Sequence, residues 1–150
     1  MADYFRLRFT IEGVPELSRL LQMEYNKVEN FQKPLQKSAQ LVLADVQTNF
    51  QTEGGLVGGW QPLTAGTVKG RLRGGFGGAH PILQRSGKLK SSFYSRVTAK
   101  KAIMTSNSPY FKYHQSRMAR HVIPRRAMLV LTEGTRQNIV EEFHNFLRFK

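Results

Sequence analysis

Apolar side chains recur at helical spacing in three stretches of the chain. The most regular stretch is residues 35–50, whose stripe comprises Leu35, Ala39, Val42, Leu43, Val46 and Phe50. A shorter helix is predicted to begin near Pro15, because the missing N–H of proline suits a first turn. A last helix is predicted after Thr132, a good N-cap residue. The pattern therefore predicts about three helices.

Alternation of apolar and polar residues predicts short strands elsewhere. Residues 5–11 alternate strictly, and residues 93–98 and 102–105 flank a turn as a hairpin. Residues 128–131 are a further plausible strand, and a short helix is expected to begin at Pro109. We therefore predict an α+β fold, with a small antiparallel sheet packed with about three helices, in a single domain over residues 1–150.

The regular pattern stops between residues 51 and 81, where glycines are frequent. We predict a long glycine-rich basic loop here, since long structureless segments in a compact domain are usually functional or become ordered on binding. Residues 69–80 are expected to be its mobile part. The apolar residues expected to anchor the loop to the body are Trp60, Leu63, Ile82, Leu83 and Leu89.

The formal net charge of +13 is unevenly distributed along the chain. Residues 1–50 carry equal numbers of acidic and basic side chains, whereas residues 54–132 contain no Asp or Glu. Such an excess predicts attraction to nucleic acid, an anionic membrane surface or an acidic protein face. No apolar run approaches the roughly 20 residues that a membrane span needs, so we expect no membrane partner.

The residue types that catalysis or metal binding needs are not combined in a recognisable pattern. Residues 54–132 offer no carboxylate to orient a histidine, and no G-x-S-x-G motif is present. His114 and His121 have no third ligand nearby, and the absence of Cys excludes thiolate sites. Glycines at residues 70–78 match neither the P-loop nor the dinucleotide-binding spacing. We expect no enzyme activity, catalytic residue, cofactor or metal.

Aromatic and basic residues are interleaved in residues 110–120. These aromatic rings could stack on bases, as in proteins that bind single strands. Alternatively, Tyr110, Phe111 and Tyr113 belong to the core or to a protein interface. We favour the second interpretation, because no known motif for single-strand binding accompanies them.

Four blocks of residues stand out from Trp60 onward. They are Trp60-Gln61-Pro62-Leu63 with Thr67 and Lys69, Ile82 through Leu89 with Ser92, Tyr110 through Gln115, and Ile123 through Leu129. In this order they resemble the phage virion morphogenesis (tail completion) family of Mu-like and other contractile- or long-tailed phages. The family often has a glycine shortly after its His-Gln pair, where this chain has Ser116-Arg117-Met118, and usually an aromatic residue where this chain has Met128.

The resemblance implies a non-enzymatic structural protein of the virion, a ring-forming subunit at the head–tail junction. Its expected partners are further copies of itself in a hexameric ring, because phage tails are usually six-fold, and the connector, tail terminator and tail tube proteins. Packaged double-stranded DNA is a further, non-specific partner, since the basic loops of a ring would face its channel. The protein would be made in the host bacterial cytoplasm and would end in the neck of the virion.

Nine basic side chains are candidates for contact with the DNA channel or with a neighbouring subunit: Lys69, Arg71, Arg73, Arg85, Lys88, Arg117, Arg120, Arg125 and Arg126. The alternative function is non-specific nucleic-acid binding by the free protein, which predicts binding with a steep dependence on salt. A remote enzyme such as a nuclease is disfavoured by the scarcity of acidic residues after residue 53.

Overall fold

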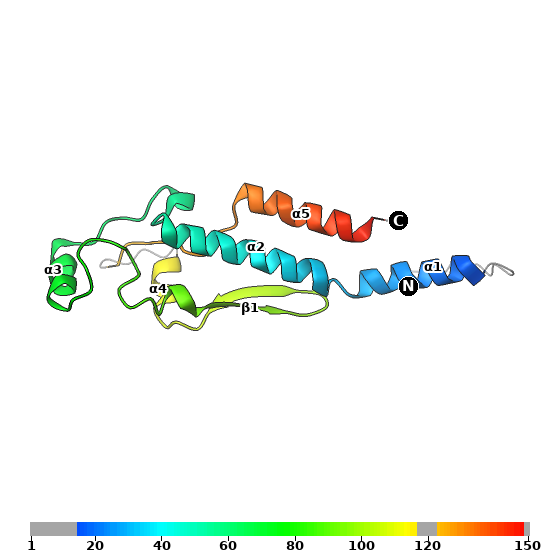
Figure 1. Ribbon diagram of the computed structural model, residues 1–150, viewed down its shortest axis with the longest axis horizontal. Coiled ribbons are helices and arrows are strands. Elements are labelled where there is room, and N and C mark those ends of the chain that lie inside the picture. Colours follow the sequence, from blue (N-terminus) through cyan, green and yellow to red (C-terminus); the bar gives the residue numbers. More distant parts are fainter. Residues whose placement is uncertain (1–14, 117–122, 149–150) are drawn as a thin grey trace, which may run out of the picture.

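Helix α2 (Gln32–Gln51) runs through the middle of the molecule in the computed structural model, and the other elements lie around and beyond it (Figure 1). The structure describes residues 15–116 and 123–148, so the strand predicted at residues 5–11 lies outside it. Helix α5 (Glu133–Leu147) packs against α2, as does the hairpin of β1 (Phe93–Val97) and β2 (Ala102–Ser106). The predicted α+β class is confirmed.

The sequence of α2 explains its central place. Pro34 lies in its first turn, where a missing N–H removes no helical hydrogen bond, and Val46 and Phe50 are buried near its end. After the helix, Gly54 has a φ of 91°, a conformation that favours glycine. A Cβ at Gly54 would also overlap the indole of Trp60, so the close approach of Trp60 to the end of α2 requires glycine here.

The hairpin and the last helix form as the sequence predicts. Strands β1 and β2 pair antiparallel, with Phe93 opposite Ser106. The side chain of Thr132 accepts a hydrogen bond from Thr135 N at 3.1 Å, which caps α5, and donates to Asp45 Oδ2 at 3.1 Å. The cap of α5 is thereby tied to α2.

The segment predicted to be a long loop, residues 51–81, contains two helical elements. These are η1 (Gly55–Val57) and α3 (Ala65–Arg73), the second capped by Thr64, whose side chain accepts a hydrogen bond from Thr67 N. The local pattern carries no helical signal here because Gly66 and Gly70 lie inside α3 and lower its intrinsic propensity. The stretch expected to be mobile therefore begins inside a helix.

The strand predicted at residues 128–131 is wrong. Within the described residues, the only strand pairing joins β1 and β2, and residues 124–132 have no regular secondary structure. Several of their backbone groups bond to side chains of other segments instead. The remaining short elements are η2 (Lys90–Ser92) and α4 (Phe111–Gln115), the second beginning two residues after Pro109.

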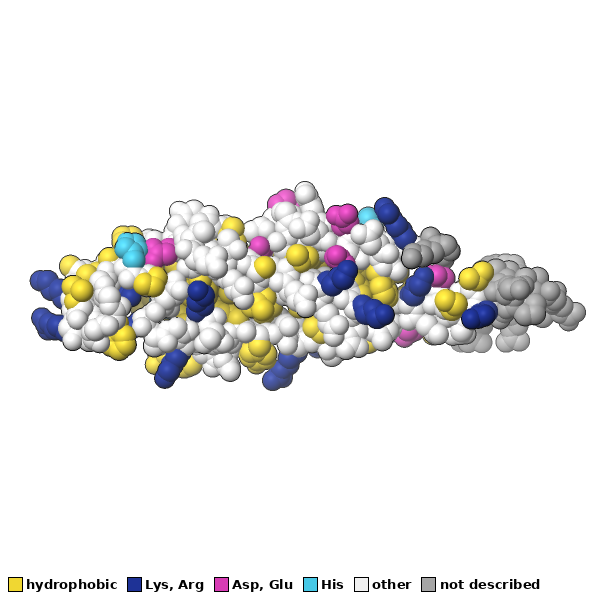
Figure 2. Space-filling model, in the orientation of Figure 1, with side chains coloured by type: hydrophobic (Ala, Val, Ile, Leu, Met, Phe, Trp, Pro, Cys, Tyr) yellow, Lys and Arg dark blue, Asp and Glu magenta, His cyan; other side chains and the backbone are white. Residues whose placement is uncertain are grey.

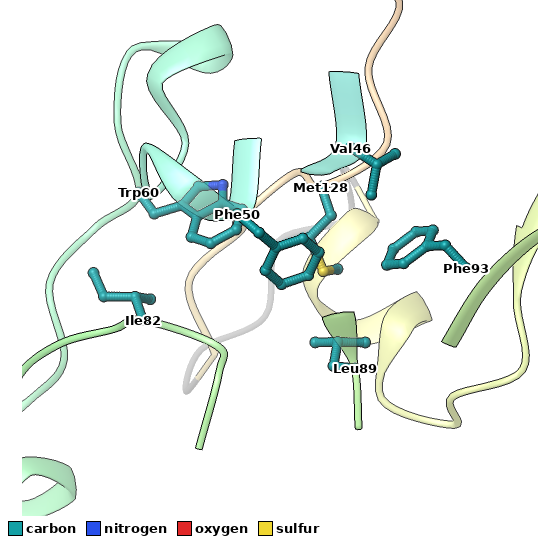
Figure 3. Packing of buried hydrophobic residues seen from close by; sticks show 7 residues of the cluster. All are labelled: Val46, Phe50, Trp60, Ile82, Leu89, Phe93 and Met128. Atoms are coloured by element: carbon teal, nitrogen blue, oxygen red, sulfur yellow. The ribbon is translucent and has the colours of Figure 1, made fainter. Parts of the chain in front are cut away.

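The core gathers around the C-terminal half of α2 (Figure 3). Its buried members are Val46, Phe50, Trp60, Ile82, Leu89, Phe93 and Met128, with Leu63 and Leu83 packed against them. The ring of Phe50 meets Trp60 at 5.3 Å and Phe93 at 5.9 Å between centroids, both edge-on. All five residues expected to anchor the glycine-rich segment therefore reach this cluster.

Helix α1 (Pro15–Glu29) projects from one end of the body, beyond the start of α2, and α3 lies at the opposite end (Figure 1). It begins at Pro15, as predicted. Five of its large apolar side chains are at least 50% exposed: Leu20, Leu21, Met23, Tyr25 and Val28. Among the described residues, the rest of the protein thus leaves these five side chains largely uncovered.

Candidate functional site

The side chain of Gln115, at the end of α4, bonds to the backbone of the next segment as a neighbouring strand would. Its Oε1 accepts hydrogen bonds from Met128 N and Leu129 N, both at 3.0 Å. Its Nε2 donates to Leu129 O at 2.7 Å. Because backbone groups in the interior must be paired, one amide side chain here takes the place of a sheet ladder.

Asn49 and Trp60 hold the other side of the same segment. Asn49 Nδ2 donates to Ala127 O at 2.9 Å and to Met128 O at 3.2 Å. Trp60 Nε1 donates to Ala127 O at 2.9 Å. The segment that carries Met128 is thus fastened to both α2 and the turn after it.

Arg126 uses its guanidinium inside the protein. Its Nε donates to Gln61 O at 2.8 Å and its Nη2 to Pro62 O at 3.0 Å. Burial lowers the pKa of Arg126 from its usual value. Although the sequence made Arg126 a candidate for contact with a partner, its guanidinium joins two segments of its own chain.

Arg71 has a similar internal position on α3. Its Nη1 donates to Pro81 O at 3.1 Å and its Nη2 to Phe76 O at 3.2 Å, with the side chain buried. The guanidinium carbon of Arg85 lies 4.4 Å from the centroid of the Phe76 ring, a cation–π contact. These contacts fold residues 74–81 back on α3, and we call residues 63–81 the α3 arm.

The nine contact candidates therefore fall into three groups. Arg71 and Arg126 are buried, and Arg117 and Arg120 lie outside the described residues. The exposed candidates are Lys69, Arg73, Arg85, Lys88 and Arg125. Figure 2 shows Lys and Arg side chains at the α3 end, while most Asp and Glu side chains on this face lie toward α5 and α1. The α3 end thus presents positive charge to the solvent.

A groove of about 1330 Å³ lies between the α3 arm and α4. Its apolar lining includes Leu63, Phe76, Leu83, Leu89, Tyr110 and Ile123. Its basic lining comprises Arg71, Arg85, Lys88 and Arg126, and His114 also lines it. Among the described residues no Asp or Glu lines it, and we call it the basic groove.

His114 stands in this groove as a neutral ring at neutral pH. Burial and the nearby charge of Arg126 lower the pKa of His114, and a hydrogen bond with the Pro124 backbone partly offsets them. Its buried Nδ1 has no hydrogen-bond partner among the described residues. Protonating the ring would therefore place a further charge beside a buried guanidinium.

This arrangement predicts that acid destabilises the fold through His114. The unfolded chain takes up the proton near pH 6.5 and the folded chain only at lower pH, so stability is lost as the pH falls below about 6.5. Urea unfolding at pH 7.5 and 5.5 should show a smaller acid loss for His114→Gln than for the wild type. His144→Gln, exposed on α5, is the control and should keep the wild-type loss. Equal losses for His114→Gln and the wild type would contradict the prediction.

The aromatic residues of residues 110–113 are divided between core and surface. Phe111 packs against the core cluster, with its ring centroid 5.4 Å from that of Phe93. Tyr110 lies beside the basic groove and is 65% exposed. The favoured core interpretation therefore holds for Phe111, while Tyr110 remains accessible to a partner.

The described residues form neither a metal cluster nor a membrane-spanning helix. No group of three or more His, Asp or Glu side chains in this part of the chain is placed to hold a metal ion. No helix there combines the length and apolar character needed to cross a membrane.

Sequence reasoning missed the structural roles of three polar side chains. Asn49 and Gln115 bond to the segment around Met128, and Glu53 accepts a hydrogen bond from Ile82 N at 2.7 Å while its other oxygen pairs with His80. One signal was available for Asn49, because it lies between Val46 and Phe50 on the part of α2 that is buried. Nothing in the sequence indicated which backbone groups these side chains would meet.

The described structure is a small α+β protein with a large exposed basic surface and an uncovered apolar helix. Residues 14–148 match the phage virion morphogenesis family, and the chain belongs to this family. It therefore has a role in building the phage particle, as a virion protein. Comparisons with curated proteins and with solved structures give no match.

The four blocks behind the resemblance meet around the end of α2. Trp60, Ile82 and Met128 join the core cluster, and Gln115 and Arg126 bond to backbone carbonyl and amide groups of the other blocks. Met128 is completely buried at the position where the family usually has an aromatic side chain. These blocks therefore build the scaffold that shapes the basic groove.

Proposed function

We propose that this protein is a ring-forming subunit of the phage neck, which completes the tail and joins it to the head. Family membership supports a role in virion assembly. The observation that carries the finer assignment is the basic groove, which no Asp or Glu of the described residues lines, together with the exposed cations at the α3 end. A ring threaded by DNA needs such a surface on its inner side or between its subunits, because the packaged phosphates are densely charged.

In this proposal the protein works by contact and has no enzyme activity. Copies form a hexameric ring, and the ring contacts the connector, the tail terminator or the tail tube. Of the exposed candidates, Lys69 and Arg73 lie on α3 and face the packaged DNA or the adjacent subunit. Lys88 and Arg85 stand in the basic groove and serve a protein partner.

A phage that lacks this gene tests the proposal. We expect lysates with separate heads and tails in electron micrographs, and a return of joined particles when the wild-type gene is supplied in trans. A reconstruction of the wild-type virion should then show this chain at the neck. Joined, infectious particles without the protein would overturn the proposal, as would density for this chain at the distal end of the tail.

Non-specific nucleic-acid binding by the free protein is the second candidate, and the net charge of +13 favours it. It predicts duplex DNA binding tighter than roughly 10⁻⁴ M at physiological salt. The double variant Lys69→Gln, Arg73→Gln should then lower the salt slope by about 0.9 for each phosphate that the variant no longer neutralises. Arg19→Gln with Lys33→Gln is the matched control, because both side chains are exposed and far along the chain from α3. Weaker binding than this limit, or equal slopes for both double variants, would remove this candidate.

A further inference from the structure

We propose that helix α1 of one copy docks in the basic groove of the next copy, head to tail around the ring. This inference rests on the proposed ring and names the contact that closes it. Helix α1 and the elements that line the groove lie toward opposite ends of the molecule, so each copy supplies one half of every contact (Figure 1). Four features support the docking: the exposure of α1, its attachment, the lining of the groove and the position of one glutamate.

Helix α1 has an apolar face that the body does not cover. Leu20, Leu21 and Val28 lie on one side of the helix, and their exposed fractions are 55%, 61% and 54%. A helix of 15 residues is marginal in water without packing. Packing of its apolar face against a partner surface would therefore stabilise the helix.

The base of α1 is held to the body, so the helix projects in a defined direction. Phe31 packs on Phe143 and Phe146, with centroid distances of 5.6 Å and 6.1 Å. Its backbone N donates to Ala99 O at 2.7 Å, and Glu29 pairs with Lys100 at 3.1 Å. This attachment holds the C-terminal end of α1 to the body, and the helix projects from there at one end of the molecule (Figure 1).

The basic groove has the dimensions and lining for such a helix. Its volume of about 1330 Å³ exceeds the roughly 300–1,000 Å³ of small-molecule pockets, which favours a macromolecular occupant. Leu63, Phe76 and Leu83 supply apolar surface, and Lys88 and Arg85 supply exposed positive charge. No carboxylate lies within 4 Å of either cation among the described residues.

Charge complementarity selects α1 as the occupant. Glu24 lies between Leu21 and Val28 on the apolar face, one helical turn from each. Its only ion-pair partner among the described residues is Lys27 of the same helix. Docking would bring Glu24 to the cations of the groove, which lack an acid of their own.

The occupant must come from another copy of the chain. The 20 residues of α2, about 30 Å of helix, separate α1 from the groove, so α1 cannot reach the groove of its own body. A contact between two different surfaces of identical chains is head to tail, and it closes into a ring when the rotation per subunit allows. This geometry agrees with the proposed neck ring.

Cross-linking in assembled particles tests the docking directly, because the chain contains no cysteine. Phage carrying the variant Leu21→Cys, Ser86→Cys should give a ladder of this chain with a short bismaleimide, since Ser86 lines the groove. The matched control is Asn26→Cys, Ser86→Cys, because Asn26 lies on the opposite side of α1 and should give no ladder. Cross-linked peptides identified by mass spectrometry assign the contact.

A charge exchange provides the second measurement. Glu24→Lys and Lys88→Glu should each lower the yield of joined particles at least roughly tenfold, because like charges would face each other in the contact. The combination Glu24→Lys, Lys88→Glu should restore most of the yield. Asn26→Lys makes a new positive charge on the polar side of α1 and should leave the yield unchanged.

The outcomes separate this inference from the proposed function. Infectious Leu21→Cys, Ser86→Cys particles without a ladder, or with cross-links inside one chain or to another virion protein, would overturn the docking and leave the neck ring standing. A combined charge exchange no better than its single variants would count equally against the docking. Absence of the chain from the neck would instead remove the proposed function.

Discussion

Replacing Trp60 with alanine should lower the free energy of unfolding by roughly 3–5 kcal/mol. The indole is 7% exposed, packs edge-on against Phe50, and donates a hydrogen bond to Ala127 O. Its removal leaves a cavity at the centre of the core and frees the turn that begins at Gly54. Because small domains are stable by only about 5–15 kcal/mol, the loss is a large part of the total. Urea unfolding followed by circular dichroism measures it.

Two further variants make the Trp60 prediction specific. Trp60→Phe keeps an aromatic ring but loses the N–H, and should cost only about 1–2 kcal/mol, since Asn49 still donates to Ala127 O. Leu72→Ala removes a large apolar side chain that is 59% exposed on α3, and should change stability by less than about 0.5 kcal/mol. If Trp60→Ala were no more destabilising than Leu72→Ala, the core around Phe50 would be assigned incorrectly.

Replacing Gln115 with leucine should cost roughly 3–5 kcal/mol, although the change conserves much of the volume. The variant leaves three backbone groups without their partner: Met128 N, Leu129 N and Leu129 O. Each unpaired buried group costs about 1–3 kcal/mol. The segment after Arg126 should then detach from α4, and amide hydrogen exchange at Met128 and Leu129 should become faster than in the wild type.

Gln84→Leu is the matched control for Gln115→Leu. Gln84 has one corresponding bond, from its Nε2 to Phe50 O at 2.8 Å, and its replacement should cost only about 1 kcal/mol. Gln115→Glu adds a finer comparison, because a carboxylate still accepts from both N–H groups but cannot donate to Leu129 O. It should lie between the wild type and the leucine variant in stability. Equal stability of Gln84→Leu and Gln115→Leu would contradict the role assigned to Gln115.

The local pattern of the chain was enough to predict elements whose stabilising contacts lie mostly within themselves. Three such signals each occupy only a few neighbouring residues. They are the apolar stripe of α2, the cap residue Thr132 before α5, and the alternation on both sides of the hairpin turn. Periodicity and capping act over one or two turns, so they are visible in a short stretch of sequence. The same holds for the start of α1 at Pro15.

The errors fall where distant residues decide the conformation. Helix α3 contains two glycines, and the guanidinium of Arg71 ties it to the following segment through hydrogen bonds to Phe76 O and Pro81 O. Residues 128–131 have the composition of a strand, but Gln115 and Asn49 take the place of a neighbouring strand. The bonds of Arg71 span 5 and 10 residues, that of Gln115 to Met128 N spans 13, and that of Asn49 to Ala127 O spans 78, so the helical and strand periods of the sequence do not reveal them.

The candidate site shows the same division between composition and position. The acid-free composition of residues 54–132 predicted positive charge, and five of the nine candidate cations are exposed in the structure. Composition did not distinguish exposed Lys69 and Arg73 from Arg71, which lies between them in the chain and turns inward. Nor did any pattern in the sequence indicate that the apolar side of α1 would face away from the body.

The sequence by itself determined the α+β class, the family and the sign of the charge, because each depends on which residues are present and in what order. Only the tertiary structure decided which cations are free, since burial depends on what packs against each side chain. It also decided that α1 lies at one end of α2, while α3 and α4, whose residues line the basic groove, lie at the other (Figure 1). That separation depends on the folded structure, and because of it α1 cannot reach the basic groove of its own copy.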